Sequence, residues 1–157
     1  MKLLSLTAVI AFVLDQVSKY LVIHVMGVSA FNSIDVAPPL LRFIYGENRG
    51  INFGLGYGIP VWALIGVALA ICAAVLWWMT RRAQPALAQI SAGLLIGGAL
   101  ANVLDRLLYG YVLDFLNMSC CGIDNPFVFN VADIFIFAGA FGLVFFADDG
   151  KPRKKGA

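Results

Sequence analysis

"FNVADIFIFAGAFGLVFF", residues 129–146, is nearly all apolar, but an asparagine, Asn130, and an aspartate, Asp133, lie near its start. An apolar run of this kind is typical of a helix that crosses the hydrocarbon core of a bilayer, which takes roughly 20 residues. An ionisable side chain inside such a helix is costly and is a candidate for function. The segment therefore predicts a membrane fold with a site near one end of this helix.

The rest of the chain has the same character. Of its 157 residues, 61% are hydrophobic and only 13% are charged, which is unlike a soluble domain. Four apolar stretches reach or approach the length of a membrane span, at about 3–22, 59–79, 86–108 and 131–147. We therefore expect an all-α membrane protein with four transmembrane helices, in which residues 1–157 form a single integral membrane domain.

The basic residues indicate how the chain is oriented. With four spans, one side of the membrane receives most of them: Lys2, Arg81, Arg82, Lys151, Arg153, Lys154 and Lys155. The positive-inside rule then puts both termini in the cytoplasm, including a basic tail at 148–157 that lies against anionic lipid. The connections at 23–58 and 109–130 face outward. Because Asp15 and Lys19 interrupt the first apolar run, we do not expect it to be a cleaved signal peptide.

The first outward connection contains strand and turn signals. Pro38 and Pro39 lead into "LLRFIY" (40–45), which predicts a short strand. "GENRGINFGLGYG" (46–58) follows, with five glycines in thirteen residues. On the residues alone this region is either a flexible loop or a small sheet on the membrane surface, whose glycines let the backbone approach a ligand closely.

Several polar residues fall in the outer half of the predicted spans or in the outward connection beside them. Asp15 and Lys19 are four residues apart on one helix face, which predicts a salt bridge. The others are Asn102, Asp105, Asp114, Asn130 and Asp133. An Asn three residues from an Asp can serve a catalytic site, but it can equally cap a helix or bond across a helix interface. A transporter is disfavoured, because the second helix and the inner parts of the third and fourth carry no charged residue for a relay across the bilayer.

Five short motifs in series resemble those of the bacterial lipoprotein signal peptidases, also called signal peptidase II. They are "DQVSK" (15–19), "NRGINFG" (48–54), "GGALANVLDR" (97–106), "VLDF" (112–115) and "FNVAD" (129–133). The departures are Ile51 and Asn52, where the family often has small apolar residues, and "MSCCGIDNP" (118–126), which matches no motif and is a candidate for a flap over the site.

The resemblance implies an aspartic endopeptidase of the bacterial inner membrane, with its active site at the outer face. It removes the signal peptide of a prolipoprotein by cutting just before a diacylglyceryl-cysteine. The family's catalytic aspartates correspond to Asp114 and Asp133. Positions that line the site for substrate, and for inhibitors of the globomycin type, correspond to Asn48, Gly50, Asn102, Arg106 and Asn130, while Asp15, Lys19 and Asp105 correspond to structural support. The family's small extracytoplasmic sheet, or cradle, corresponds to the region after Pro39.

The implied chemistry agrees with elementary principles. Two close, partly buried carboxylates share one proton, so that one can act as a base on water while the other polarises the scissile carbonyl. We therefore expect no metal, no cofactor and no nucleic acid partner, and we expect His24, the only histidine, to be an interfacial or a packed residue rather than a ligand. The second hypothesis is a non-enzymatic membrane protein that binds a lipid or a partner through the same outer cavity. Cleavage of a lipidated prolipoprotein peptide would distinguish the two.

Overall fold

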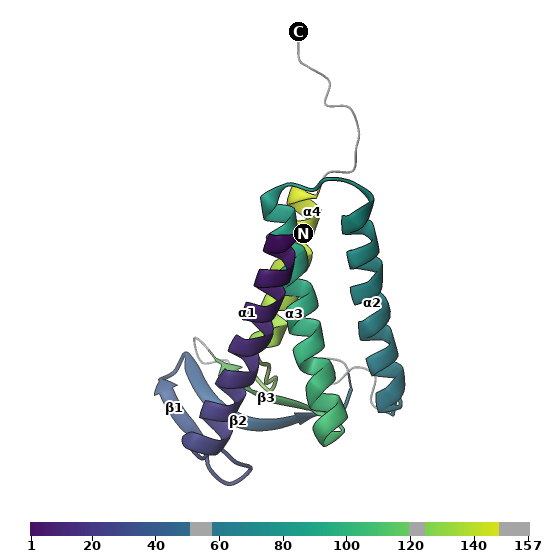
Figure 1. The fold of residues 1–157 in the computed structure, drawn as a ribbon. Coiled ribbons are helices and arrows are strands. Elements are labelled where there is room, and N and C mark those ends of the chain that lie inside the picture. The colour runs from purple at the N-terminus through teal and green to yellow at the C-terminus, as the bar shows by residue number, and fades with distance from the viewer. Residues whose placement is uncertain (51–57, 120–124, 148–157) are drawn as a thin grey trace.

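The computed structural model describes residues 1–50, 58–119 and 125–147, and within these ranges the chain forms four long helices and one three-stranded sheet (Figure 1). In chain order the elements are α1 (Lys2–Lys19), which continues as the π-helical turn η1 (Tyr20–Val25), β1 (Ile34–Ala37), β2 (Leu41–Asn48), α2 (Val61–Arg81), α3 (Ala86–Tyr109), β3 (Val112–Met118) and α4 (Val131–Phe146). Each predicted helix is present, with ends shifted by a few residues.

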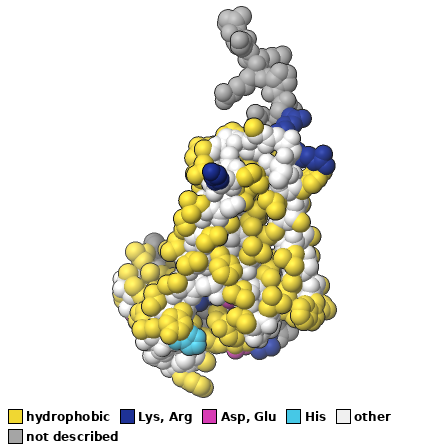
Figure 2. Space-filling model, in the orientation of Figure 1, with side chains coloured by type: hydrophobic (Ala, Val, Ile, Leu, Met, Phe, Trp, Pro, Cys, Tyr) yellow, Lys and Arg dark blue, Asp and Glu magenta, His cyan; other side chains and the backbone are white. Residues whose placement is uncertain are grey.

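The helices have the length and the surface of membrane spans. Three stretches are long and apolar enough to cross a bilayer: α1 with η1, α2 and α3. The fourth helix, α4, is shorter at 16 residues. Large apolar side chains such as Val9, Trp62, Val67, Phe141 and Val144 are exposed on the flanks of the bundle. Figure 2 shows hydrophobic atoms covering this side, which suits contact with lipid rather than water.

Helix α3 is the centre of the bundle and packs against the other three helices. Glycine allows the close approach. A Cβ on Gly93 would lie 2.6 Å from the carbonyl oxygen of Leu4 in α1, and a Cβ on Gly98 would lie 2.6 Å from that of Ala132 in α4. Small residues at helix crossings are the usual means of tight packing in a membrane, where no hydrophobic driving force brings helices together.

The sheet contains the predicted strand and also one from another part of the chain. It is antiparallel with the order β1–β2–β3, and the strand expected at 40–45 lies in β2. The third strand, β3, comes from the connection after α3, where the sequence predicted an outward-facing segment but no strand. Helix α3 ends at Gly110, whose φ of 80° is a left-handed cap that turns the chain sharply into β3.

An apolar cluster fixes the sheet against η1. Its buried members are Val22, Val28 and Phe115, and the ring of Phe115 meets that of Phe43 edge to face at 5.7 Å between centroids. Since β3 contributes Phe115 to this cluster and pairs with β2, the neighbouring Asp114 is held on a rigid element.

The two ends of the bundle differ in the elements and in the charged side chains that they carry. The sheet lies at one end, and the start of α1 and the connection between α2 and α3 lie at the other (Figure 1). Basic side chains gather at this second end in Figure 2. Residues 51–57, with Ile51 and Asn52, and residues 120–124, with Cys120 and Cys121, are outside the described part of the chain.

Candidate active site

The first turn of α4 presents Asp133. Asn130 is the N-cap of this helix, and its Oδ1 accepts a hydrogen bond from the backbone N–H of Asp133 at 2.9 Å. The Oδ2 of Asp133 in turn accepts from the backbone N–H of Asn130 at 3.3 Å. This reciprocal arrangement is a capping box. The helix cap that the sequence left as an alternative is therefore present, and it holds a buried carboxylate at the sheet end of the bundle.

Strand β3 presents the second aspartate. Asp114 is 2% exposed and is paired with Gly46 of β2. Its Oδ1 accepts a hydrogen bond from Nδ2 of Asn130 at 2.6 Å, and its Oδ2 accepts from Nδ2 of Asn48 at 3.1 Å. Asn130 thus bonds both aspartates, one through its amide nitrogen and the other through its amide oxygen.

The two carboxylates are close enough to affect each other's ionisation. Burial, and then the negative charge of Asp133, raises the pKa of Asp114 to about 7. Hydrogen bonds from Asn48 and Asn130 and the charge of Lys19 oppose this rise, but burial outweighs them. The site therefore holds a proton near neutral pH that an exposed aspartate would have lost.

Two side chains of α3 complete the surroundings of the pair. Nδ2 of Asn102 donates to Oδ1 of Asp133 at 3.1 Å, and Oδ1 of Asn102 accepts from Nδ2 of Asn130 at 3.2 Å. One turn later, Nη2 of Arg106 donates to the carbonyl of Gly50 at 3.0 Å, while its Nε is buried without a partner among the described residues. Arg106 therefore ties the start of the glycine-rich segment to α3.

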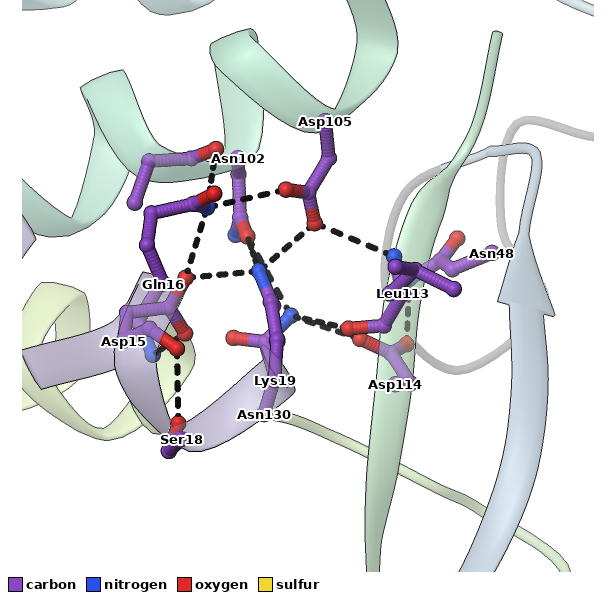
Figure 3. A network of polar contacts seen from close by, with 12 residues as sticks. Asp15, Gln16, Ser18, Lys19, Asn48, Asn102, Asp105, Leu113, Asp114 and Asn130 are labelled. Atoms are coloured by element: carbon purple, nitrogen blue, oxygen red, sulfur yellow. Dashed lines mark hydrogen bonds and ion pairs between the residues drawn. The ribbon is translucent and has the colours of Figure 1, made fainter. Parts of the chain in front are cut away.

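A buried ion cluster of Asp15, Lys19 and Asp105 lies next to Asn102 (Figure 3). Nζ of Lys19 is 2.7 Å from Oδ2 of Asp15 and 2.6 Å from Oδ2 of Asp105, so the predicted salt bridge within α1 is confirmed and gains a second acid from α3. Both acids also hold backbone beside the aspartate pair. Asp15 accepts from the N–H of Ala132 at 2.8 Å, and Asp105 accepts from the N–H of Leu113 at 3.1 Å.

Gln16 is a contributor that the sequence analysis missed. Its Nε2 donates to Oδ1 of Asp105 at 2.9 Å, and it reaches Oδ2 of Asp15 at 3.3 Å. The available signal was its position next to Asp15 in a largely apolar helix, where an amide needs a partner.

The ten residues singled out in the sequence lie in one connected hydrogen-bond network. Followed in space, they run Arg106, Gly50, Asn48, Asp114, Asn130, Asp133, Asn102 and Lys19, and from there to Asp15 and Asp105. The arrangement provides two adjacent carboxylates, amide donors on both, a nearby guanidinium and a fixed backbone. These are the parts that hydrolysis by an acid–base pair of carboxylates needs.

Comparisons with known proteins agree with this chemistry. Residues 7–147 match the family model described as "Signal peptidase (SPase) II". The chain is 38% identical over 156 residues to a lipoprotein signal peptidase of Alteromonas mediterranea, covering 94% of this chain and 83% of that protein. It is 35% identical over 162 residues to a lipoprotein signal peptidase of Chlorobaculum tepidum, covering 98% of this chain and 99% of that protein.

Two solved structures share the fold. A bacterial membrane enzyme determined by the in meso method at 2.3 Å resolution superposes with a TM-score of 0.77 at 31% identity, covering 88% of this chain and 83% of that one. A second, at 1.9 Å resolution, superposes with a TM-score of 0.75 at 31% identity, covering 88% of each chain.

Proposed function

The chain belongs to the signal peptidase II family, the aspartic peptidases that remove signal peptides from prolipoproteins, and on that premise we propose that Asp114 and Asp133 are its catalytic pair. Family membership decides against the binding protein considered as a second hypothesis. The predicted reaction class, enzyme type and four-helix fold are thereby confirmed.

The observation that carries the assignment is the link through Asn130. Its amide nitrogen lies 2.6 Å from Oδ1 of Asp114, and its amide oxygen accepts from the backbone of Asp133 at 2.9 Å, so one side chain fixes both acids. Both are at least 95% buried. Two acids this close share a proton, and the pair titrates as a unit.

The shared proton divides the roles in hydrolysis. The ionised member takes a proton from water as water attacks the scissile carbonyl, and the protonated member donates a hydrogen bond to the carbonyl oxygen. The proton gained by the base then passes to the leaving nitrogen as the peptide bond breaks. Because the pKa of Asp114 is raised to about 7, we assign the shared proton in the free enzyme to Asp114 and the role of base to Asp133.

We propose that the substrate binds to the side-chain amides, the guanidinium and the backbone carbonyl around the pair. These groups belong to Asn48, Gly50, Asn102, Arg106 and Asn130. Side-chain amides and a fixed carbonyl can bind an extended peptide on both sides of the scissile bond. Inhibitors of the globomycin type would occupy the same groups. The cut falls just before the diacylglyceryl-cysteine, because the lipid chains keep that residue at the membrane surface.

The enzyme is a multi-pass bacterial membrane protein. Its proposed orientation puts the sheet end outward and both termini in the cytoplasm of the bacterial inner membrane. Two observations support this. The start of α1 with Lys2 and the end of α2 with Arg81 and Arg82 lie at the end of the bundle opposite the sheet, and the positive-inside rule assigns that end to the cytoplasm. The aspartate pair lies at the sheet end, where the lipid-anchored substrate of the outer leaflet can reach it.

A cleavage assay with purified protein tests the catalytic pair. The substrate is a diacylglyceryl-modified prolipoprotein peptide in detergent micelles, and the products are separated by mass. Asp114→Asn and Asp133→Asn should each remove cleavage while leaving the protein folded, because Asn keeps the volume but cannot ionise.

Asp35→Asn is the matched control. Asp35 is a half-exposed aspartate of β1 that pairs with Arg42, outside the network described above. Its variant should cleave at the normal rate. Near-normal cleavage by Asp133→Asn at equal amounts of folded protein would show the pair to be misassigned, and Asp105 would then be the next candidate to act with Asp114.

A further inference from the structure

Lys19 contributes a fully enclosed ammonium group to the surroundings of the aspartate pair. Its side chain is 3% exposed. Its Nζ lies 2.7 Å from Asp15, 2.6 Å from Asp105 and 3.3 Å from Oδ1 of Asn102, so three acceptors match its three protons. The first two contacts neutralise charge, but the third joins Lys19 to a side chain that contacts Asp133.

The contact with Lys19 determines which end of the Asn102 amide faces Asp133. An ammonium group can only donate, so the amide group must turn its oxygen toward Lys19. The amide nitrogen then points at Oδ1 of Asp133, 3.1 Å away. Asn130 donates to the same Asn102 oxygen at 3.2 Å and favours the same orientation. Figure 3 shows the ammonium group of Lys19 between Asp15, Asp105 and Asn102.

A reversed Asn102 amide would have the opposite effect on the pair. Its oxygen would face Asp133, and two acceptors meet favourably only if the carboxyl carries a proton. In the observed orientation the amide nitrogen of Asn102 donates to Asp133, and a hydrogen bond to an ionised carboxylate is stronger than one to a neutral group. The orientation of one amide therefore biases the pair toward the ionised or the protonated state of Asp133.

We propose that Lys19 is a positioning residue for catalysis: through Asn102 it keeps a hydrogen-bond donor on Asp133, so that this carboxylate is ready to act as the base. The inference rests on the proposed catalytic pair and assigns to Lys19 a role beyond the structural support expected from sequence.

The other charges near the pair do not supply this donor. The charged groups that face it are Asp15 and Lys19 from α1 and Asp105 and Arg106 from α3, whereas Glu47 and Arg49 beside β2 pair with each other. Arg106 bonds to the carbonyl of Gly50.

The test must separate the donor from the charge. Removing Lys19 alone leaves Asp15 and Asp105 buried without their cation, a change that strongly destabilises a folded protein. The experiment therefore uses Asp15→Asn as its background, which keeps an acceptor for the N–H of Ala132. Two double variants are compared in it, Asp15→Asn with Lys19→Met and Asp15→Asn with Lys19→Gln. Both carry a net charge of −1 at positions 15, 19 and 105, as the wild type does, and they differ in whether residue 19 can donate to Asn102.

The readouts are kcat and KM for the lipidated peptide across pH 4 to 9, with SDS-induced unfolding as a check on folding. The acidic limb of the kcat profile of the Met variant should move up by about one pH unit with little change in KM, so that kcat measured on that limb is about tenfold lower than in the Gln variant. The Gln variant should recover most of the rate and the original acidic limb.

The possible results are distinct. Equal kcat values and equal pH profiles for the Met and Gln variants would overturn the proposal, because a hydrogen-bond donor at residue 19 would then have no effect on catalysis. Failure of both double variants to fold, with Asp15→Asn folded, would also overturn it, because Lys19 would then be a structural residue. Activity of Asp114→Asn or Asp133→Asn would instead overturn the catalytic pair itself.

Discussion

Replacing Asp114 with Asn should make the protein inactive and, above neutral pH, more stable. The reason is that the folded protein binds a proton at Asp114 more tightly than the unfolded chain does. Burial and the charge of Asp133 raise the pKa of this carboxyl from 3.8 to about 7. Below pH 3.8 both states are protonated, and Asp114 has no net effect on folding. Between pH 3.8 and 7 the unfolded chain has lost this proton while the folded protein still holds it, so the free energy of unfolding falls as the pH rises. Above pH 7 both states have lost the proton, and the free energy of unfolding falls no further through this group.

The size of the effect follows from these two pKa values. At about 1.4 kcal/mol per pH unit, the wild type loses about 4 kcal/mol between pH 4 and pH 8 through this one group. Asn cannot ionise and escapes the loss. It also replaces an oxygen that accepts from Asn48 at 3.1 Å with a nitrogen, which costs about 1–2 kcal/mol for one mismatched bond. The net gain of Asp114→Asn is therefore about 2–3 kcal/mol at pH 8, and at pH 4 the variant is slightly the less stable protein.

Unfolding by SDS in mixed micelles measures this difference. The three tryptophans, Trp62, Trp77 and Trp78, all lie in α2 and provide a fluorescence signal distant in sequence from the substitution. Wild type, Asp114→Asn and the control Asp35→Asn are compared at pH 4 and pH 8. The control should show no gain that depends on pH in this way. An Asp114→Asn variant with the same stability difference at both pH values would refute the raised pKa, and with it the shared proton on which the mechanism depends.

The other predictions concern catalysis, orientation and packing. Asp133→Asn should lower kcat by about 10³-fold or more. The double variant with Asp114→Asn should be hardly slower, as expected of two residues that act as a unit. A double variant slower by the product of the two single losses would contradict this. The rate of wild-type cleavage should fall as the pH rises above about 7, because the proton held through the raised pKa of Asp114 is lost; a rate still rising at pH 9 would exclude a shared proton. Reporters fused after Arg82 and after Ala157 should lie in the cytoplasm, and one fused near Asn117 should lie outside. A cytoplasmic location of the reporter near Asn117 would contradict the proposed orientation. Gly93→Val should destabilise the helix bundle by about 3 kcal/mol or more through the approach of its Cβ to Leu4, while Gly66→Val in α2, where nothing lies within 4 Å, should leave unfolding in SDS unchanged.

The sequence predicted the helices because long apolar runs and charged ends are local properties. The contact between Asp15 and Lys19 was predictable for the same reason, since a spacing of four residues puts both on one helix face. The resemblance to the family supplied Asp114 and Asp133, which spacing alone did not single out from the other aspartates.

The contacts that give the site its rigidity were not predictable in this way. β3 pairs with β2 although about 70 residues separate them along the chain, and no local pattern names a strand's distant partner. Asp15 bonds to the backbone of Ala132, and Asp105 to that of Leu113. A backbone N–H is present at every residue except proline, so only the folded chain shows which one a buried acid selects. The sequence also left helix capping and catalysis as alternatives for Asn130 and Asp133, whereas the structure shows the cap beside the site.

The capping box at the start of α4 links biogenesis to activity. Asn130 can reach Asp114 only when α4 has its first turn in place and β3 lies beside it, and the same amide group then supports Asp133. A partly inserted chain, with α4 still outside the bundle, would have neither a capped helix nor an assembled pair of acids. On the proposed catalytic pair, we expect newly made copies to have no peptidase activity until α4 has docked, so that turnover of a lipidated substrate counts the molecules that have completed insertion.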